Sequence, residues 1–70
     1  MGQREVIEFM RELRLKGDHE FYNIAEISRM MMVPDNRISK QVRRLLKYGF
    51  LEVTATNLWQ RKYRLKKKYL

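Results

Sequence analysis

Cationic and amide side chains recur at short intervals between residues 36 and 47. The long side chains of Arg and Lys can reach phosphate oxygens, and they can also donate to the O6 and N7 atoms of guanine. The amides of Asn and Gln can pair with adenine through two hydrogen bonds. We therefore expect this segment to contact a nucleic acid. The candidates for base edges are Asn36, Arg37, Lys40 and Gln41, and the candidates for phosphates are Arg43, Arg44 and Lys47.

The charge of the chain is divided unevenly along its length. Up to Val33 there are five basic and six acidic residues, a net charge of −1, whereas from Pro34 onward eleven basic and two acidic residues give +9. A cationic surface on ordered elements is the electrostatic footprint of phosphate binding. The distribution predicts a near-neutral scaffold with a polyanion-binding surface, and nucleic acid is the expected polyanion.

A helix from about Asp35 to Tyr48 would position the candidate side chains. Ile38, Val42 and Leu45 recur at helical spacing as a narrow apolar stripe, and we expect Gly49 to cap the end of the helix. With the helical period, the five basic residues of this segment fall opposite the stripe or on one flank of it. The spacing thus places them on one exposed face.

Two further helices are expected before this one. Apolar residues recur with helical spacing over about residues 3–16, and Glu20-Phe21-Tyr22 then predicts one short strand. Asn23 and Glu26 have the spacing of a capping box, which indicates a second helix over about residues 24–32. This helix ends near Pro34, because proline disfavours helical geometry in the residue before it.

After the third helix the hydrophobic period becomes that of a strand. Apolar and polar residues alternate from Leu51 to Ala55, which predicts a strand with one buried face. The turn Thr56-Asn57 leads into a second strand from Leu58 to Lys66, so a hairpin is expected over about residues 51–66. We expect Trp59 to lie in the core beneath this hairpin.

The order of these elements is similar to that of the winged helix-turn-helix family of bacterial and archaeal transcriptional regulators. Four segments carry the resemblance, in order and without a gap: Ile24-Ala25-Glu26-Ile27-Ser28, Ile38-Ser39-Lys40-Gln41-Val42-Arg43-Arg44-Leu45, Tyr48-Gly49-Phe50-Leu51-Glu52-Val53 and Lys62-Tyr63-Arg64-Leu65. The resemblance implies one α+β domain over residues 1–70, mostly helical, with three helices and a C-terminal β-hairpin wing in the order α-β-α-α-β-β.

In that family the helix after the turn enters the major groove of DNA, and the wing lies along the backbone or the minor groove. The resemblance implies that residues 35–48 form the recognition helix and that Thr54 to Arg61 form the wing. It implies sequence-specific binding of double-stranded DNA by a small transcriptional regulator. The candidate contacts on the wing are Thr54, Thr56, Asn57, Arg61 and Lys62.

The turn between the second and third helices departs from the family pattern. Many helix-turn-helix motifs have glycine where this chain has Met32, because the backbone there goes to positive φ. A bulky side chain is strained in that conformation, so we expect the turn to adopt another geometry.

Two other binding functions fit the same charge pattern. An RNA or single-strand binding module would use Trp59 and Tyr63 to stack on bases. A protein-interaction winged helix in a larger assembly would instead offer its basic face to an acidic partner, and a charged helix face can also be merely solvated. The run Lys66-Lys67-Lys68 would add nonspecific DNA affinity or only solubility.

The composition excludes several classes of protein. The chain has 70 residues and no cysteine, which excludes disulfides, zinc fingers and thiol catalysis and leaves little room for a catalytic cleft. It has no Gly-rich phosphate loop and no nucleophile beside a base, and His19 has no partner at metal-ligand spacing. We expect no enzymatic activity, no metal, no cofactor and no small-molecule ligand.

The sequence also sets expectations for location and assembly. No apolar run is long enough for a membrane span and no signal-peptide core is present, so we expect a cytoplasmic protein, associated with the nucleoid if its source is prokaryotic, viral or plasmid-borne. A homodimer formed through Phe9 and Met10, or through aromatic residues of the wing, is compatible with the pattern.

Overall fold

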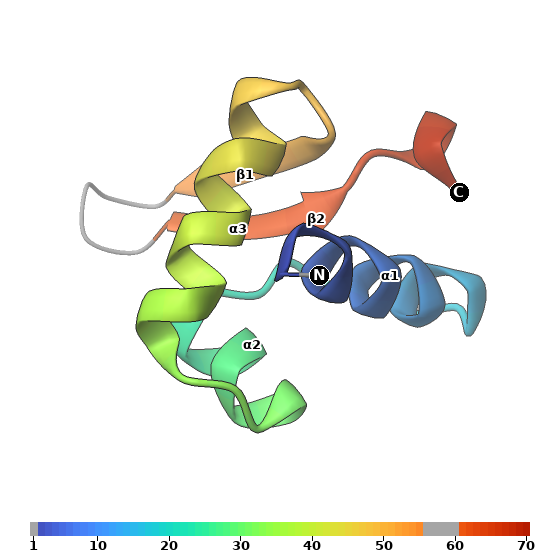
Figure 1. Cartoon of the computed structure of the whole chain (residues 1–70). Coiled ribbons are helices and arrows are strands. Elements are labelled where there is room, and N and C mark those ends of the chain that lie inside the picture. The colour runs from blue at the N-terminus through green and yellow to red at the C-terminus, as the bar shows by residue number, and fades with distance from the viewer. Residues whose placement is uncertain (1, 56–60) are drawn as a thin grey trace.

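The computed structural model describes residues 2–55 and 61–70 of the chain (Figure 1). In this part of the chain, the helices are α1 (Gly2–Leu15), α2 (Ile24–Met31) and α3 (Asp35–Lys47), and they are followed by strands β1 (Leu51–Ala55) and β2 (Arg61–Leu65) and a 3-10 turn, η1 (Lys67–Tyr69). The strands pair antiparallel. The fold is a small α+β domain of three helices with a hairpin after them, and none of its described helices is long and apolar enough to cross a membrane.

The boundaries of α2 and α3 follow from their capping residues. The Asn23 side chain accepts from the Glu26 amide at 2.7 Å and the Glu26 carboxylate accepts from the Asn23 amide at 3.0 Å, so the predicted capping box is confirmed. At the end of α3 the C-cap is Tyr48, and the predicted cap residue Gly49 lies one position beyond it at φ 77. Gly49 N donates to Leu46 O at 3.1 Å and Phe50 N to Leu45 O at 2.9 Å. These bonds form a Schellman motif, which needs the left-handed residue that glycine supplies.

The turn between α2 and α3 contradicts the sequence expectation. Met32 adopts the left-handed conformation, with φ 57 and ψ 44, so the expectation of another geometry is wrong. Hydrogen bonds centred on Ser28 hold this turn: the Ser28 carbonyl accepts from the Met32 amide and from the Val33 amide, and its hydroxyl donates to Val33 O. The Met32 side chain is 91% exposed, so it meets no packing conflict there.

The strand expected at residues 20–22 is reduced to one bridge. Tyr22 N donates to Tyr63 O at 2.9 Å and Tyr63 N to Tyr22 O at 2.7 Å, so Tyr22 pairs with β2 on the side away from β1. The pairing stops there because Asn23 is already the N-cap of α2. At Tyr63, β2 is therefore flanked by β1 on one side and by Tyr22 on the other.

The core lies between the three helices and the inner face of the hairpin. Burying an apolar side chain of this size stabilises the folded state by about 1.5–3 kcal/mol. The core residues are Val6, Met10, Ile27, Ile38, Val42, Leu45, Leu51, Tyr63 and Leu65.

The hairpin is buried less evenly than its alternation predicts. Of the apolar residues in β1, only Leu51 is buried, whereas Val53 is 52% exposed and Ala55 is exposed, so the expectation of a continuous buried face is wrong. Tyr63 and Leu65 on β2 are buried, because α1 and Tyr22 pack against that strand. The outer part of β1 therefore extends the hairpin beyond the core.

The segment after β2 packs back onto α1. Tyr69 makes an edge-to-face contact with Phe50, with ring centroids 4.5 Å apart, and its carbonyl accepts from Arg11 Nε at 3.1 Å. Lys66 N donates to Phe50 O at 2.9 Å. The Lys66-Lys67-Lys68 run thus lies at an anchored turn, beside the end of α1 in Figure 1.

Candidate nucleic-acid interface

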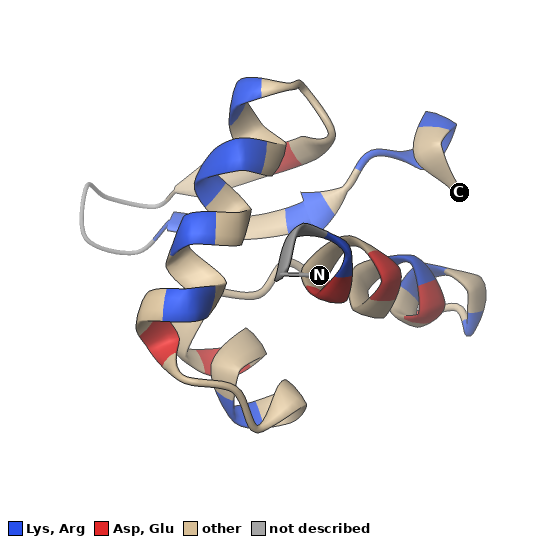
Figure 2. Ribbon diagram, in the orientation of Figure 1, with Lys and Arg blue, Asp and Glu red and all other residues tan. Residues whose placement is uncertain are grey.

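One long face of α3 is exposed along the whole helix. On the opposite side Ile38, Val42 and Leu45 are buried, so the apolar stripe faces the core as its spacing predicts. Figure 2 shows basic positions recurring from the first turn of α3 to its C-terminal end, whereas acidic and basic positions are mixed on α1. We call the exposed basic residues of this helix the α3 basic face: Arg37, Lys40, Arg43, Arg44 and Lys47.

Most of this face has no competing partner among the residues that the structure describes. Lys40, Arg43, Arg44 and Lys47 form no ion pair with any described residue. Asn36, at the start of the helix, is also exposed. Among the residues predicted to meet base edges or phosphates, these five are exposed and have no side-chain partner in residues 2–55 and 61–70.

Gln41 is the exception among the predicted base-edge residues. Its side chain is part of the core, with 4% exposure, and its Oε1 accepts from the Val6 amide of α1 at 3.0 Å. The prediction that Gln41 contacts a base is therefore wrong. Gln41 lies next to Val42 at the edge of the apolar stripe, and α1 covers that edge. Its Nε2 is buried and has no hydrogen-bond partner among the described residues.

Arg37 is exposed but not isolated. Its Nη2 donates to Oε1 of Glu5, which lies in the first turn of α1, and the two side chains are 52% and 30% exposed. The ion pair therefore links the first turns of α1 and α3 at the surface. Exposed pairs of this kind stabilise a fold by only about 0–1 kcal/mol.

The candidate contacts on the hairpin lie on both of its faces. Thr54 is exposed and pairs with the half-buried Lys62, and exposed Arg61 pairs with Ala55. Because alternate residues of a strand face opposite sides, Thr54 and Lys62 share the outer face, whereas Arg61 is on the side of Tyr63. The remaining candidates, Thr56 and Asn57, lie outside the described residues, as does Trp59.

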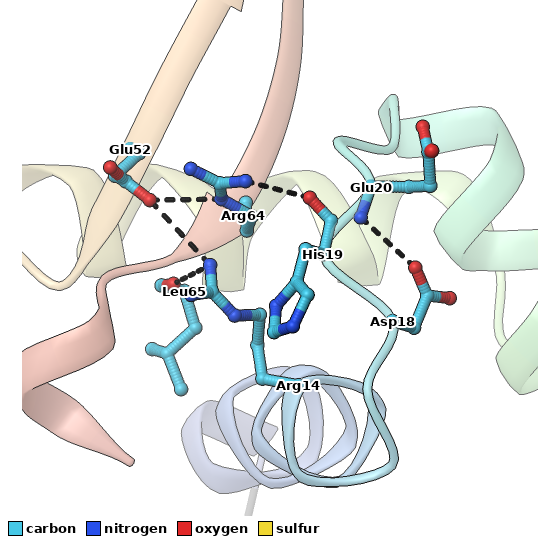
Figure 3. A network of polar contacts seen from close by, with 7 residues as sticks. All are labelled: Arg14, Asp18, His19, Glu20, Glu52, Arg64 and Leu65. Carbon is cyan, nitrogen blue, oxygen red and sulfur yellow. Dashed lines mark hydrogen bonds and ion pairs between the residues drawn. The ribbon is translucent and has the colours of Figure 1, made fainter.

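Two arginines at the base of the hairpin are engaged inside the protein (Figure 3). Arg64 donates from Nε to Glu52 Oε2 at 2.9 Å and from Nη1 to the His19 carbonyl at 2.7 Å, and it stacks over the Phe21 ring at 4.2 Å. Arg14 donates to the Leu65 carbonyl at 3.1 Å, and its Nη1 lies 3.7 Å from the same Glu52 oxygen. We call Arg14, Glu52 and Arg64 the hairpin-base network. On the outer face of the hairpin, the charge of Arg64 is consequently offset by Glu52.

The loop between α1 and α2 is held by the Asp18 carboxylate. This carboxylate accepts from the Tyr22 hydroxyl and from the Glu20 amide, and both bonds lower the pKa of Asp18 below its usual value. The same contact raises the pKa of Tyr22 to about 12, since the bond holds the phenolic proton. The loop thereby places the His19 carbonyl against Arg64.

Two further features of the described residues concern metal ligands and the surface of α1. These residues contain no cluster of His, Asp and Glu that could hold a metal ion. Of the residues expected at one possible homodimer surface, Met10 lies in the core with 3% exposure and Phe9 is partly buried against it.

Known proteins provide no guide to this arrangement. Comparison of the chain with models of protein families, with curated proteins and with solved structures finds no match.

Proposed function

We propose that this chain is a sequence-specific double-stranded DNA-binding protein of the winged helix-turn-helix type. In this proposal α3 enters the major groove, and the β1–β2 hairpin lies beside it on the backbone or the minor groove. The observation that supports it most strongly is the α3 basic face: the basic residues of one helix are exposed together, and most have no partner among the described residues.

The shape and charge of α3 suit a groove lined by phosphates. A major groove about 12 Å wide admits one α-helix, and cations along that helix can reach phosphates on both sides. Asp35, in the first turn, is the only acidic residue of α3. Near the helix start, Asn36 and Lys40 are exposed where side chains can project to base edges.

A duplex of DNA fits better than the other nucleic acids considered. Of the two rings expected to stack on a single strand, Tyr63 is only 6% exposed and its backbone is paired with Tyr22, and Trp59 lies outside the described residues; Tyr48, at the end of α3, is the exposed ring beside the helix. The major groove of duplex RNA is too deep and narrow for side chains to read. The exposed helix face therefore favours double-stranded DNA.

A salt titration with a labelled DNA duplex tests the proposal. About seven phosphate contacts predict that log affinity falls with log salt at a slope near −6. Duplex RNA and single strands serve as competitors in the same fluorescence assay. A slope shallower than about −2, or equal competition by single strands, would contradict duplex binding.

Selection from random duplexes tests sequence specificity. Enrichment of one motif is expected, and its palindromy or asymmetry would report whether one or two copies of the chain bind. Control of transcription is the role that we infer for such binding. A reporter placed behind the enriched motif should change its expression when the chain is supplied.

A further inference from the structure

The first turn of α3 contains an arginine that a carboxylate from another helix already holds. Arg37 donates through Nη2 to Glu5 of α1, across a separation of 32 residues in the sequence. Among the members of the α3 basic face, Arg37 alone forms an ion pair with a described residue. It is also the member nearest the start of the helix, where side chains can project to base edges.

The contact uses only part of the guanidinium. Arginine presents five N–H donors in a planar fork, and Glu5 is bonded to Nη2 alone. Arg37 remains 52% exposed on its side chain, so the other donors are accessible. A carboxylate that holds one corner of the fork reduces the rotamer freedom that the arginine would lose on binding.

We infer that Arg37 recognises a guanine in the major groove and that Glu5 is its positioning residue. This inference rests on the proposed function, since it assigns one base contact within that interface. Guanine is the expected base because its O6 and N7 atoms accept two parallel bonds from an arginine fork. Such a contact requires an arginine that is oriented rather than free to follow the nearest phosphate.

Glu5 is expected to act on phosphates as well as on Arg37. Its negative charge lies beside the cation that would otherwise pair with the backbone, so it disfavours contacts that are independent of sequence. A repulsive group of this kind lowers the affinity for all duplexes, but it lowers the affinity for the preferred duplex least. Glu5 thus increases the ratio of specific to nonspecific affinity.

The hairpin-base network shows what a purely structural arginine looks like in this protein. Arg64 uses two of its nitrogens in hydrogen bonds and one face of its plane on Phe21, and its side chain is 24% exposed. Arg37 has one side-chain partner among the described residues and about twice that exposure. The difference favours an external ligand for Arg37 over a role as a brace between helices.

Three single variants of the full chain test the inference: Arg37→Gln, Glu5→Gln and the control Glu8→Gln. Glu8 lies one turn further along α1, is exposed and forms no ion pair with a described residue, so its variant changes the net charge equally and spares Arg37. Each variant is measured against the selected duplex, against duplexes substituted at each G·C pair, and against an unrelated duplex. Thermal melting confirms that each variant is folded.

The expected results differ in sign among the variants. Arg37→Gln should reduce affinity for the selected duplex by roughly tenfold to hundredfold and abolish the preference at one G·C pair, with a smaller effect on the unrelated duplex. Glu5→Gln should increase affinity for the unrelated duplex about twofold to fivefold and reduce the specificity ratio about fivefold. Glu8→Gln should raise both affinities together and leave the ratio unchanged.

Three results would overturn the inference, in whole or in part, in distinguishable ways. If the wild-type chain prefers certain duplexes and Arg37→Gln keeps the same preference at every position, the guanine contact is wrong while the proposed function stands. The same holds for Glu5 if its variant and the Glu8 variant have equal specificity ratios. If the wild-type chain shows no preference among duplexes at all, the proposed function fails and the inference fails with it.

Discussion

The basic side chains of α3 and those at the base of the hairpin are alike in type but differ in their surroundings. On α3 the cations are exposed and, apart from Arg37, form no ion pair with a described residue. At the base of the hairpin, Arg14 and Arg64 contact Glu52 and backbone carbonyls of distant segments. The first set remains available for a ligand, whereas the second set holds α1, the α1–α2 loop and the hairpin together.

The comparison shows that the carboxylates near an arginine indicate whether it stabilises the fold or is exposed to a ligand. Glu52 accepts from Arg64 and lies beside Arg14, and it is the only acidic residue of the hairpin strands. No acidic residue occupies the exposed face of α3 beyond its first turn. The presence of Glu52 beside Arg14 and Arg64, and the absence of such a carboxylate along the exposed face of α3, therefore distinguish the hairpin-base network from the α3 basic face.

The largest expected effect concerns ligand affinity. Replacing Lys40 and Arg44 together with Gln removes two cations from the α3 basic face and should reduce duplex DNA affinity roughly 50-fold near 0.1 M salt, about 2.4 kcal/mol, with a salt slope shallower by about 2. The melting temperature should not change, because both side chains are exposed. An anisotropy titration in several salt concentrations measures both quantities, and unchanged affinity would show that DNA does not contact this face.

The next effect concerns stability rather than DNA affinity. Arg64→Met removes the bonds to Glu52 and His19 while keeping an unbranched side chain, and the free energy of unfolding should fall by about 1–2 kcal/mol, a value that allows for partial exposure. Urea denaturation measures this loss. Lys62→Met, on the same face of the same strand, is the matched control and should leave stability nearly unchanged while weakening DNA binding. Equal destabilisation by the two variants would remove the distinction between the two regions.

A smaller effect tests Gln41, the buried side chain at the edge of the apolar stripe of α3. Gln41→Met keeps a similar volume but removes the acceptor of the Val6 amide, and we expect a loss of about 0.5–1 kcal/mol in unfolding free energy. DNA affinity should stay the same, in contrast to Asn36→Ala on the exposed side of the helix. A loss of affinity in the Gln41 variant without a loss of stability would return Gln41 to the binding face.

The smallest effect concerns the loop that supports the hairpin-base network, and it depends on pH. Tyr22→Phe should reduce the unfolding free energy by about 0.5 kcal/mol at neutral pH. Because the folded pKa of Asp18 is lowered from 3.8, this stabilisation is present above about pH 4 and is lost as pH falls further. Because the pKa of Tyr22 is raised from 10.0 to about 12, it is also lost as pH rises through that range. Urea denaturation of the wild-type chain and of Tyr22→Phe, repeated across pH, should show a difference in unfolding free energy only between about pH 4 and about pH 12.

Local patterns predicted the helices and the orientation of α3. The spacing of Ile38, Val42 and Leu45 gave the buried side of that helix, and the Asn23–Glu26 pair gave the start of α2, because both signals depend on residues within one or two turns. Glycine at residue 49 likewise indicated the end of α3. The basic face followed from the same helical period, so this part of the candidate site was predicted before any tertiary contact was known.

The incorrect predictions concern residues whose conformation depends on distant partners or on surrounding hydrogen bonds. Gln41 is buried because α1 places the Val6 amide beside it, and the two residues are separated by 35 positions. The engagement of Arg64, about which the sequence made no prediction, likewise depends on a distant group, the His19 carbonyl 45 positions earlier. Met32 keeps a left-handed conformation because of bonds to Ser28 rather than its own propensity. No periodicity in the sequence encodes these contacts.

The contacts of α1 have a consequence for how the chain reaches its folded state. Its partners lie 35 residues away at Gln41, 51 residues away at Leu65 and 58 residues away at Tyr69. Because closing such long loops is entropically expensive before the contacts form, docking of α1 is expected to come late and to limit the folding rate. During synthesis on a ribosome, Val6 and Met10 of α1 would stay exposed to solvent until the hairpin has been synthesised. We expect chaperones to bind the apolar side of α1 in that interval.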